Sequence, residues 1–395
     1  MSGNVIAEKV AADMGTASWI REMFERGRRL KAELGAENVF DFSLGNPSAP
    51  PPPEYFDALQ AVAAERDGRL HRYMPNAGFE ATRTAVARFL TREYQREFDA
   101  AGVIMTSGAA GGMNVALRAI CDPGDEIIVL APYFPEYRFY IEQAGARMVL
   151  VQTDDAFQPD PQRIAAAFTP RTRGLIVNTP NNPTGVVFSR GACQALADTL
   201  AEHDRPQRPL YLLADEPYRR LVYDVERADT PATMYPRTIL ISSFSKDLSI
   251  AGERAGYIAL SASVPHRETL VNAMTMLNRT LGFVNAAAVT QRVVARCVDA
   301  RCDIDYYRQR RDKLCHALRS FGYAFQTPGG GMFVFPRTPT EDDVAFVDLL
   351  LEQRILAVPG RGFGRAGHIR LSFATDLEVI ERSLPGFEAA IRRAR

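Results

Sequence analysis

The sequence has 395 residues, of which 46% are apolar and 24% are charged, and its 47 basic side chains are balanced by 47 acidic ones. A chain of this length can form two or three globular domains with a substantial apolar interior. Its formal net charge is zero and no run of five or more like charges occurs, so it offers no electrostatic surface for nucleic acid or for an acidic membrane. We therefore expect no polyanion among its partners.

Membrane-spanning, secretory and metal-binding patterns are not found in the sequence either. No stretch approaches the roughly 18 consecutive apolar residues of a membrane span, and the first 21 residues lack the apolar centre of a secretory signal. The five cysteines include no C-x-x-C pair and the five histidines are dispersed, so neither a disulfide framework nor a metal site is expected. These features predict a cytoplasmic protein without a bound metal.

The basic residues are divided unevenly between two types. Only four of the 47 are lysines, namely Lys9, Lys31, Lys246 and Lys313, and the other 43 are arginines. Arginine stays protonated in proteins, whereas a lysine amine can lose its proton and act as a nucleophile or a base. Lys246 is the only lysine between residues 32 and 312. The count alone leaves open that it is an ordinary surface lysine.

The N-terminal region combines an arm, a helix and a linker. The first fifteen residues are small and polar enough for a flexible arm, and the apolar spacing predicts a helix over 19–34. A short strand is expected at 41–44. The prolines at 50–53 are expected to form a rigid extended linker that is not helical, and we place a domain crossing near it.

From residue 73 onward, short β-branched runs alternate with helical stretches such as 80–94 and 112–120. This alternation is typical of βαβ units and of a mostly parallel sheet covered by helices on both faces, which is an α/β fold. A helix over 306–321 with strands at 332–335 and 368–373 indicates a separate α+β domain at the C-terminus. The strands expected in the sheet are 103–106, 127–130, 148–151, 175–177, 210–214, 238–242 and 257–260.

We expect four parts along the chain. Their boundaries follow the proline tract and the point where the alternating pattern ends. The parts are a flexible N-terminal arm at 1–15, the N-terminal part of a small domain at 16–48, a large domain at 49–292, and the C-terminal part of the small domain at 293–395.

Polar residues follow two strands of the predicted sheet that are consecutive along the chain. The strand that ends at residue 177 leads into a turn of asparagines and prolines that contains Asn182, and the strand that ends at residue 213 leads into Asp215 and Tyr218. Ligands bind at the carboxyl edge of an open α/β sheet. A carboxylate beside a buried strand needs a cationic partner, and a protonated heterocycle nitrogen would serve. Capping of backbone groups is the alternative interpretation for each of these side chains.

Lys246 follows a third strand, in the frame Ser243-Phe244-Ser245-Lys246, with Arg254 eight residues later. Hydroxyl groups and an arginine beside an amine suggest a phosphate site. A helix N-terminus also binds phosphate, and the small residues at 107–112 supply one after the strand 103–106.

Together these pieces resemble the fold type I pyridoxal-phosphate enzymes, specifically the class I and II aminotransferases related to aspartate aminotransferase. The resemblance covers about residues 16–390 and depends on three motifs in the family's order: N-P-T-G from Asn182, D-x-x-Y from Asp215, and S-x-S-K-x(7)-R from Ser243. It implies a large domain with a mostly parallel, seven-stranded sheet, a smaller α+β domain, pyridoxal 5′-phosphate as the cofactor, and a homodimer.

The resemblance also implies a role for individual residues. Lys246 matches the lysine that forms a Schiff base with the cofactor, and it is grouped with Asp215 and Tyr218 as catalytic. Tyr73 matches a tyrosine that reaches the cofactor phosphate of the neighbouring subunit. Arg370, Gly45 and Asn182 match residues that bind the substrate. The other implied cofactor ligands are Asn182, Asp215 and Tyr218 at the ring, Phe134 stacked on it, and Ser243, Ser245, Arg254, Gly108, Ala109 and Ala110 at the phosphate.

The activity implied by the resemblance is transamination by a ping-pong mechanism. The amino donor would be an L-amino acid of the aspartate or aromatic type, and the acceptor a 2-oxo acid such as 2-oxoglutarate. A β-elimination or carbon–sulfur lyase of the same superfamily is the alternative, because these residues activate the α-carbon without selecting the outcome. Arg279 is a candidate partner for a second substrate carboxylate, whereas Met332, Trp19 and Tyr133 would suit an aromatic or aliphatic side chain.

Two other classes of protein are less consistent with the sequence. A transcription regulator would need a DNA-binding module, for which the residues before the first helix are too few. A nicotinamide oxidoreductase is suggested by the G-x-G-x-x-G frame at 362–367, but that motif must open a helix in a βαβ unit, whereas here a strand is expected next. We therefore expect the segment 362–367 to be a loop.

Overall fold

The computed structural model describes residues 5–15 and 19–395, and the chain divides into two compact units. The large unit comprises residues 46–309 and 327–332. The small unit comprises the described residues up to Gly45 together with 310–326 and 333–395. The sequence places two crossings near residues 48 and 292, whereas in the structure the chain changes unit after residues 45, 309, 326 and 332.

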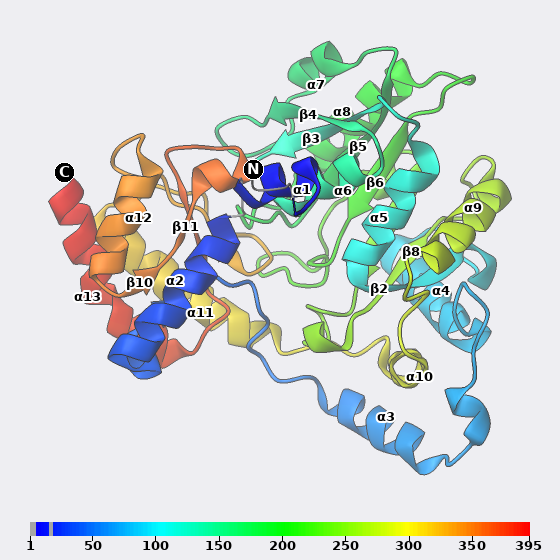
Figure 1. The fold of residues 1–395 in the computed structure, drawn as a ribbon, viewed down its shortest axis with the longest axis horizontal. Coiled ribbons are helices and arrows are strands. Elements are labelled where there is room, and N and C mark those ends of the chain that lie inside the picture. The colour runs from blue at the N-terminus through cyan, green and yellow to red at the C-terminus, as the bar shows by residue number, and fades with distance from the viewer. Residues whose placement is uncertain (1–4, 16–18) are drawn as a thin grey trace. The chain divides into compact units, whose positions relative to one another are not determined.

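A seven-stranded sheet forms the centre of the large unit in the described part of the chain (Figure 1). Its strand order is β2-β8-β7-β6-β5-β3-β4, and all strands are parallel except β8, which is antiparallel to both of its neighbours. The predicted α/β class and mostly parallel sheet are therefore confirmed. The strands are β2 (Val103–Ser107), β3 (Glu126–Ala131), β4 (Arg147–Gln152), β5 (Thr172–Asn178), β6 (Tyr211–Asp215), β7 (Thr238–Ser243) and β8 (Ala255–Ala259).

Helices cover both faces of this sheet, as consecutive residues of β3 show. Ile127 and Val129 pack into an apolar cluster with α5, α6 and α9, whereas Ile128 and Leu130 pack with α7 and α8. Successive side chains of a strand point to opposite faces, so a strand covered on both sides is apolar throughout. The helices are α5 (Gly108–Ile120), α6 (Glu136–Gln143), α7 (Pro161–Ala167), α8 (Arg190–His203) and α9 (Arg267–Thr280).

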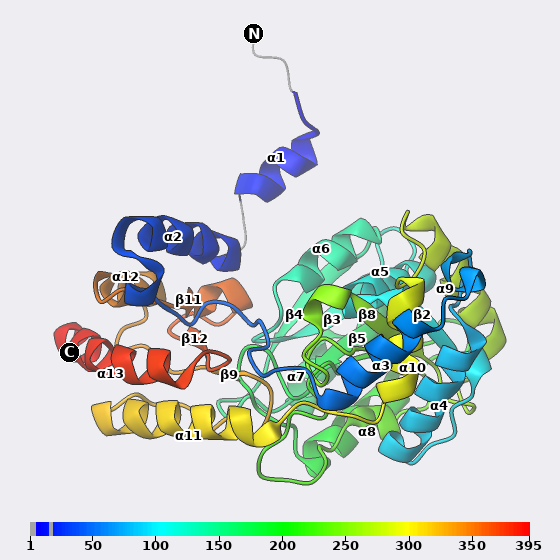
Figure 2. The same cartoon turned by 90° about the horizontal axis from the view of Figure 1, so that it is seen from below.

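Three more helices of the large unit pack together with residues of β2, β7 and β8 in a third apolar cluster. Among them α3 lies beside α10, as Figure 2 shows. The helix α3 begins at Pro53, so the prediction that the whole tract 50–53 is extended is wrong at its last residue. A proline is tolerated at the first helical position because its missing N–H has no partner within the helix there. The helices are α3 (Pro53–Ala64), α4 (Glu80–Tyr94) and α10 (Ala288–Cys297).

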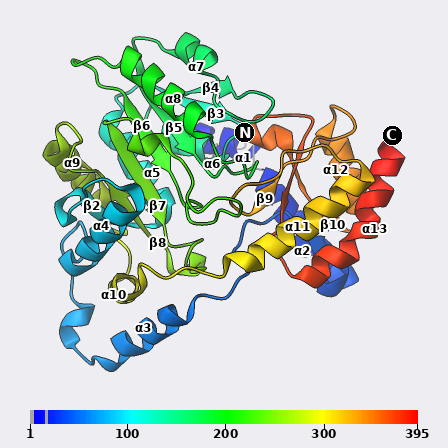
Figure 3. The same cartoon turned by 180° about the vertical axis from the view of Figure 1, so that it is seen from behind.

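The small unit contains two small sheets and several helices, among which α11 lies beside α13 (Figure 3). The hydroxyl group of Tyr323 donates a hydrogen bond to the carbonyl of Phe387 at 2.9 Å, and Lys313 pairs with Glu381. The strands are β1 (Phe40–Asp41), paired with β10 (Ile355–Leu356), and β9 (Phe333–Val334), β11 (Val358–Pro359) and β12 (Ile369–Ser372), which pair in the order β11-β12-β9. The helices are α1 (Glu8–Gly15), α2 (Trp19–Leu34), α12 (Asp343–Glu352), α13 (Leu377–Ala394) and, from residue 310 onward, α11 (Ile304–Phe321), whose first six residues belong to the large unit.

Two further expectations concern the N-terminal arm and the glycine-rich segment of the small unit. The expected flexible arm is helical over Glu8–Gly15, and residues 1–4 of the arm lie outside the described part. The glycine-rich segment 362–367 begins within the short 3₁₀ turn that follows β11 and leads into strand β12, so it lacks the helix of a dinucleotide-binding unit. Within residues 5–15 and 19–395, no helix is long and apolar enough to cross a membrane.

Candidate active site

The carboxyl edge of the large sheet brings together the strand ends that the sequence singles out. Asn178, the last residue of β5, is paired in register with Asp215, the last residue of β6. Asp215 in turn is paired with Ile241 of β7, which ends two residues later at Ser243. Parallel strands end at the same edge, so the residues that follow β5, β6 and β7 surround one region.

Asp215 is a buried carboxyl group, only 8% exposed. Its burial raises its pKa from 3.8 to about 7, although a hydrogen bond from the hydroxyl group of Tyr137 acts in the opposite direction. A buried carboxylate is costly unless a positive charge meets it. The environment of Asp215 therefore favours a cationic ligand group at this position.

Tyr137 and Asn178 are site residues that the motifs did not identify. Tyr137 bonds to the side chain of Asp215, and the Asn178 amide donates a 2.8 Å hydrogen bond to the backbone carbonyl of Asp215. A buried carboxyl group needs hydrogen-bond donors, and Tyr137 lies one helical turn after Phe134 in the same segment. The sequence therefore indicates that Asp215 needs a hydrogen-bond donor, but it does not indicate which residue supplies the donor.

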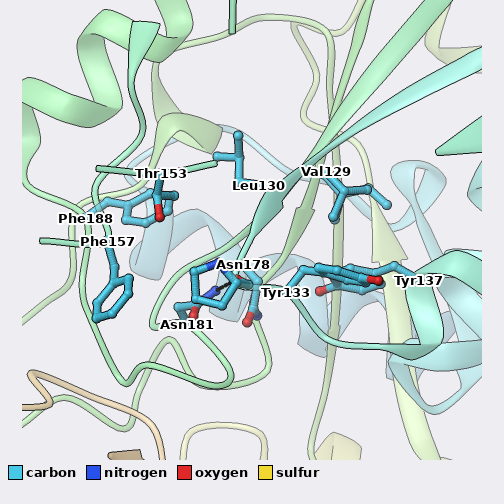
Figure 4. Close-up of a pocket in the computed structure, with 11 residues that line it drawn as sticks. Val129, Leu130, Tyr133, Tyr137, Thr153, Phe157, Asn178, Asn181 and Phe188 are labelled. Atoms are coloured by element: carbon cyan, nitrogen blue, oxygen red, sulfur yellow. Dashed lines mark hydrogen bonds between the residues drawn. The ribbon is translucent and has the colours of Figure 1, made fainter. Parts of the chain in front are cut away.

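The turn after β5 holds Asn182 in place through backbone bonds. The N–H of Asn182 donates to the side-chain oxygen of Asn178 at 2.7 Å, and the amide of Asn181 reaches the carbonyl of Pro132 at 3.5 Å. A cavity of about 10 Å³, the room for one water molecule, lies here between closely packed side chains (Figure 4). Its lining includes Tyr133, Tyr137, Asn178 and Asn181. Packing therefore leaves this turn little freedom.

Lys246 lies in the segment that follows β7, and its amine is 5.8 Å from the centre of the Tyr218 ring. Tyr218, three residues after Asp215, is 5% exposed. Residues from two separate motifs are thus neighbours in the structure. The arrangement places an amine, a phenol and a buried carboxyl group at one sheet edge.

A second group of predicted residues forms a cradle at the N-terminus of α5. Gly108 begins this helix with φ of +67°, and a Cβ added there would lie 2.6 Å from Nη2 of Arg254. A Cβ on Gly256, which is paired with Ser243 across β7 and β8, would lie 2.5 Å from the carbonyl carbon of Gly108. Only glycine lets these backbones approach so closely. The exposed Arg254 and the free N–H groups of a helix start suit an anion.

Arg370 belongs to the small unit and is almost fully buried, at 2% exposed. Its guanidinium carbon lies 4.5 Å from the centre of the Phe333 ring and 4.8 Å from that of Phe363. One of its N–H groups donates to the carbonyl of Ser43 at 2.5 Å, and a Cβ on Gly45 would lie 2.6 Å from the Phe333 ring. Gly45 and Arg370 are therefore neighbours of the same phenylalanine. Phe363 comes from the glycine-rich segment that resembles a dinucleotide fingerprint.

The remaining predicted residues lie in varied surroundings. Tyr73 is fully exposed, and Arg279 is exposed in the last turn of α9. Met332 is buried in the large unit. The others are Ala109 and Ala110 in the first turn of α5, Phe134 just before α6, the buried Ser245, the half-buried Tyr133, and Trp19, whose ring would lie 2.9 Å from a Cβ added at Gly362.

These residues fit pyridoxal phosphate. The buried carboxyl group of Asp215 suits a protonated ring nitrogen, and the glycine-lined start of α5 with Arg254 suits a phosphate. Lys246 supplies the amine that an aldehyde requires. In the described residues no group of histidine, cysteine and acidic side chains is arranged to hold a metal ion.

The sequence matches the family "Aminotransferase class I and II" over residues 37–384. Among curated proteins, an aspartate/prephenate aminotransferase of Thermus thermophilus is 33% identical over 100% of this chain and 99% of its own length. An aspartate aminotransferase of Thermotoga maritima is 30% identical over 89% and 91% of the two chains.

Solved structures agree in fold over the whole chain. An aminotransferase from Eubacterium rectale superimposes with a TM-score of 0.94 at 37% identity and covers 100% of both chains. An aspartate aminotransferase from Thermus thermophilus with maleate gives a TM-score of 0.87 at 29% identity, covering 99% of this chain and 100% of the other. The sheet edge, the cradle and these similarities lead to one conclusion: the chain belongs to the class I and II aminotransferases and is a pyridoxal-phosphate-dependent aminotransferase.

Proposed function

We propose that the enzyme moves the amino group of an L-amino acid, of the aspartate or aromatic type, to a 2-oxo acid such as 2-oxoglutarate in a ping-pong cycle. The observation that carries the proposal is the gathering of Asp215, Tyr218 and Lys246 at one sheet edge. The choice of aspartate as a donor is supported by relatives that are named aspartate aminotransferases. The exposed Arg279 is the proposed partner of the second carboxylate of such a donor.

Each residue at the sheet edge has a proposed task. Bound pyridoxal phosphate supplies an electron sink that acidifies the proton on the α-carbon of the donor. The Lys246 amine would hold the aldehyde of the cofactor and would also move the α-carbon proton. Asp215 would keep a proton at the ring nitrogen, because a buried carboxylate favours a cationic partner. Tyr218 and Asn182 would donate hydrogen bonds to the ring hydroxyl oxygen.

The phosphate and the substrate carboxylate would be held by separate groups. Arg254, Ser243 and Ser245 would bind the phosphate together with the backbone N–H groups of Gly108, Ala109 and Ala110, and Phe134 would stack on the ring. Arg370 would bind the α-carboxylate with its planar fork, assisted by the backbone of Gly45 and by Asn182. The site residues would thereby orient the donor so that its α-carbon proton faces Lys246.

The half-reaction with single amino acids tests this function. We expect the visible absorbance band of the holoenzyme to convert to the shorter-wavelength aminated form when aspartate or an aromatic amino acid is added without an oxo acid. Addition of 2-oxoglutarate should then restore the band. A band that persists while pyruvate and ammonia accumulate would instead identify a lyase.

Lys246 provides the first variant. In Lys246→Ala, the amine that would hold the cofactor is missing, so we expect no visible band after addition of pyridoxal phosphate and no measurable turnover. Lys313→Ala is the matched control, since Lys313 pairs with Glu381 on the surface of the small unit. Normal turnover in Lys246→Ala would contradict the assignment.

Asp215 makes the stability of the apoprotein depend on pH. Its folded-state pKa, about 7, exceeds its ordinary value of 3.8. The contribution of Asp215 to the free energy of unfolding is therefore complete below pH 3.8 and is lost as the pH rises through 7. Asp215→Asn should therefore melt at a higher temperature than the wild-type apoprotein at pH 8, with a difference that shrinks toward pH 4. The kcat of the holoenzyme should fall about 10²-fold, as for other losses of one preorganised charge.

The exposed Asp155 of the large unit gives the control for this pH series. Asp155→Asn should show no pH-dependent gain in melting temperature. Identical melting curves for Asp215→Asn and wild type across pH 4–8 would refute the proposed burial effect.

Arg370→Lys should raise the KM of every amino donor, because a point charge cannot form the two parallel hydrogen bonds of a guanidinium. We expect a rise of about 10- to 100-fold, the range for losing a hydrogen bond to a charged group. The exposed Arg393 serves as the control, and Arg393→Lys should leave KM unchanged. Unaltered KM values for all donors in Arg370→Lys would remove this residue from the substrate site.

We propose a homodimer in which Tyr73 reaches the phosphate of the neighbouring subunit. The fully exposed side chain of Tyr73 supports this arrangement. Sedimentation velocity should give twice the monomer mass, and Tyr73→Phe should weaken cofactor binding without changing that mass. A monomer with full activity would exclude the shared site.

A cytoplasmic location stays a prediction of the sequence.

A further inference from the structure

Two buried carboxylates of the large unit directly follow sheet-edge residues in the sequence. Glu216 and Asp247 follow Asp215 and Lys246 in the sequence, and both are buried. The carboxylate of Glu216 accepts a 2.7 Å hydrogen bond from Tyr94. Asp215 and Lys246 are thus each followed by a buried carboxylate that is bonded to other side chains of the large unit.

Arg220 faces Asp247, with 3.4 Å between Nη1 of the arginine and Oδ2 of the aspartate. Burial raises the pKa of Asp247, and the neighbouring guanidinium of Arg220 counteracts that rise. Arg220 also covers the ring of Phe89, with its guanidinium carbon 5.1 Å from the ring centre. Its side chain is 14% exposed, so it is held inside the unit.

The same guanidinium binds three consecutive backbone carbonyls. It donates to Val298 at 3.5 Å, to Asp299 at 2.7 Å and to Ala300 at 2.8 Å. These residues begin the connector segment 298–302, which leads from α10 toward α11. A planar fork with several N–H donors can serve a carboxylate and a set of carbonyls together.

Cys302, at the end of the connector segment, donates hydrogen bonds to two consecutive backbone carbonyls, those of Lys246 and Asp247. Its N–H donates to the carbonyl of Asp247 at 2.6 Å, and its thiol donates to the carbonyl of Lys246 at 3.5 Å. Burial raises the pKa of this thiol to about 12, so it stays protonated and able to donate. The backbone carbonyls of Lys246 and Asp247 are therefore both bonded to Cys302 of the connector segment, and the side chain of Asp247 is paired with Arg220.

We propose that Arg220 is a positioning residue for Lys246: it holds Asp247 and the connector segment together, so that the lysine backbone cannot shift. The inference rests on the proposed role of Lys246. Proton transfer is sensitive to the placement of the amine, and displacement by about 1 Å can cost 10²-fold in rate. Arg220 itself would touch neither cofactor nor substrate.

The test compares Arg220→Met and Arg220→Lys with the matched variant Arg237→Met. Arg237 pairs with Asp204 at 2.8 Å in the same unit, and its side-chain exposure of 15% is close to that of Arg220. Two quantities are measured besides the melting temperature of the apoprotein. They are the rate at which the visible band forms when pyridoxal phosphate is added to the apoprotein, and the kinetic isotope effect with an α-deuterated donor.

We expect Arg220→Met to slow band formation at least tenfold and to raise the isotope effect at least twofold, because the lysine amine is displaced from both reacting atoms. Arg220→Lys keeps the charge without the fork and should recover part of both. Arg237→Met should match the wild type in both quantities, even where it lowers the melting temperature equally. If Arg220→Met does not fold, Asp247→Asn, which keeps the shape and removes the ion pair, takes its place.

Wild-type band formation and isotope effect in Arg220→Met, or in Asp247→Asn where it stands in, would overturn the proposal. The same changes in Arg237→Met would also overturn it, because they would then follow from lost stability alone. A visible band in Lys246→Ala would instead overturn the proposed function, so the two failures can be told apart.

Discussion

Burying a carboxyl group at the edge of a parallel sheet is costly, and the site of this enzyme is organised around that cost. Asp215 is the last residue of β6, and burial raises its pKa. Tyr137 donates a hydrogen bond to its side chain, and the Asn178 amide donates one to its backbone carbonyl. Without a positive charge nearby, the ionised form is disfavoured. A ligand that brings a cation to this carboxyl group would offset the free-energy cost of burying its charge. Binding of such a ligand would therefore stabilise the folded protein.

In the proposed site, the sheet and its glycines would define where that ligand is held. The strand β8 runs antiparallel between β2 and β7, and it carries Gly256 next to the start of α5. Arg254, just before β8, reaches the same helix start. A phosphate group held here would fix one end of the cofactor, and the carboxyl group at the end of β6 would hold its ring. Two features far apart in the sequence would thereby define one orientation of the cofactor.

The sequence predicts the elements well where a single force dominates. Apolar periodicity predicted α4 at 80–94 and α2 at 19–34 with the bounds that the structure has, and the β-branched runs located all seven strands of the sheet. It failed where a local exception overrides the pattern, as at Pro53, which starts a helix because that position needs no N–H. The motif residues Asp215 and Tyr218 were identified from their place after a strand. Tyr137 and the Arg220 network were not, because partners chosen by tertiary packing leave no fixed spacing in the chain.

The aromatic setting of Arg370 has a consequence for selectivity. Its guanidinium lies over the rings of Phe333 and Phe363, and the side chain is nearly inaccessible to solvent. The water that normally surrounds a cation is therefore stripped away when the chain folds, before any substrate arrives. In its proposed role, Arg370 would meet an incoming carboxylate in a medium of low polarity, where opposite charges attract more strongly than in water. A simple amine without a carboxylate would gain nothing from this preparation, so the hydrophobic rings would help to distinguish amino acids from other primary amines.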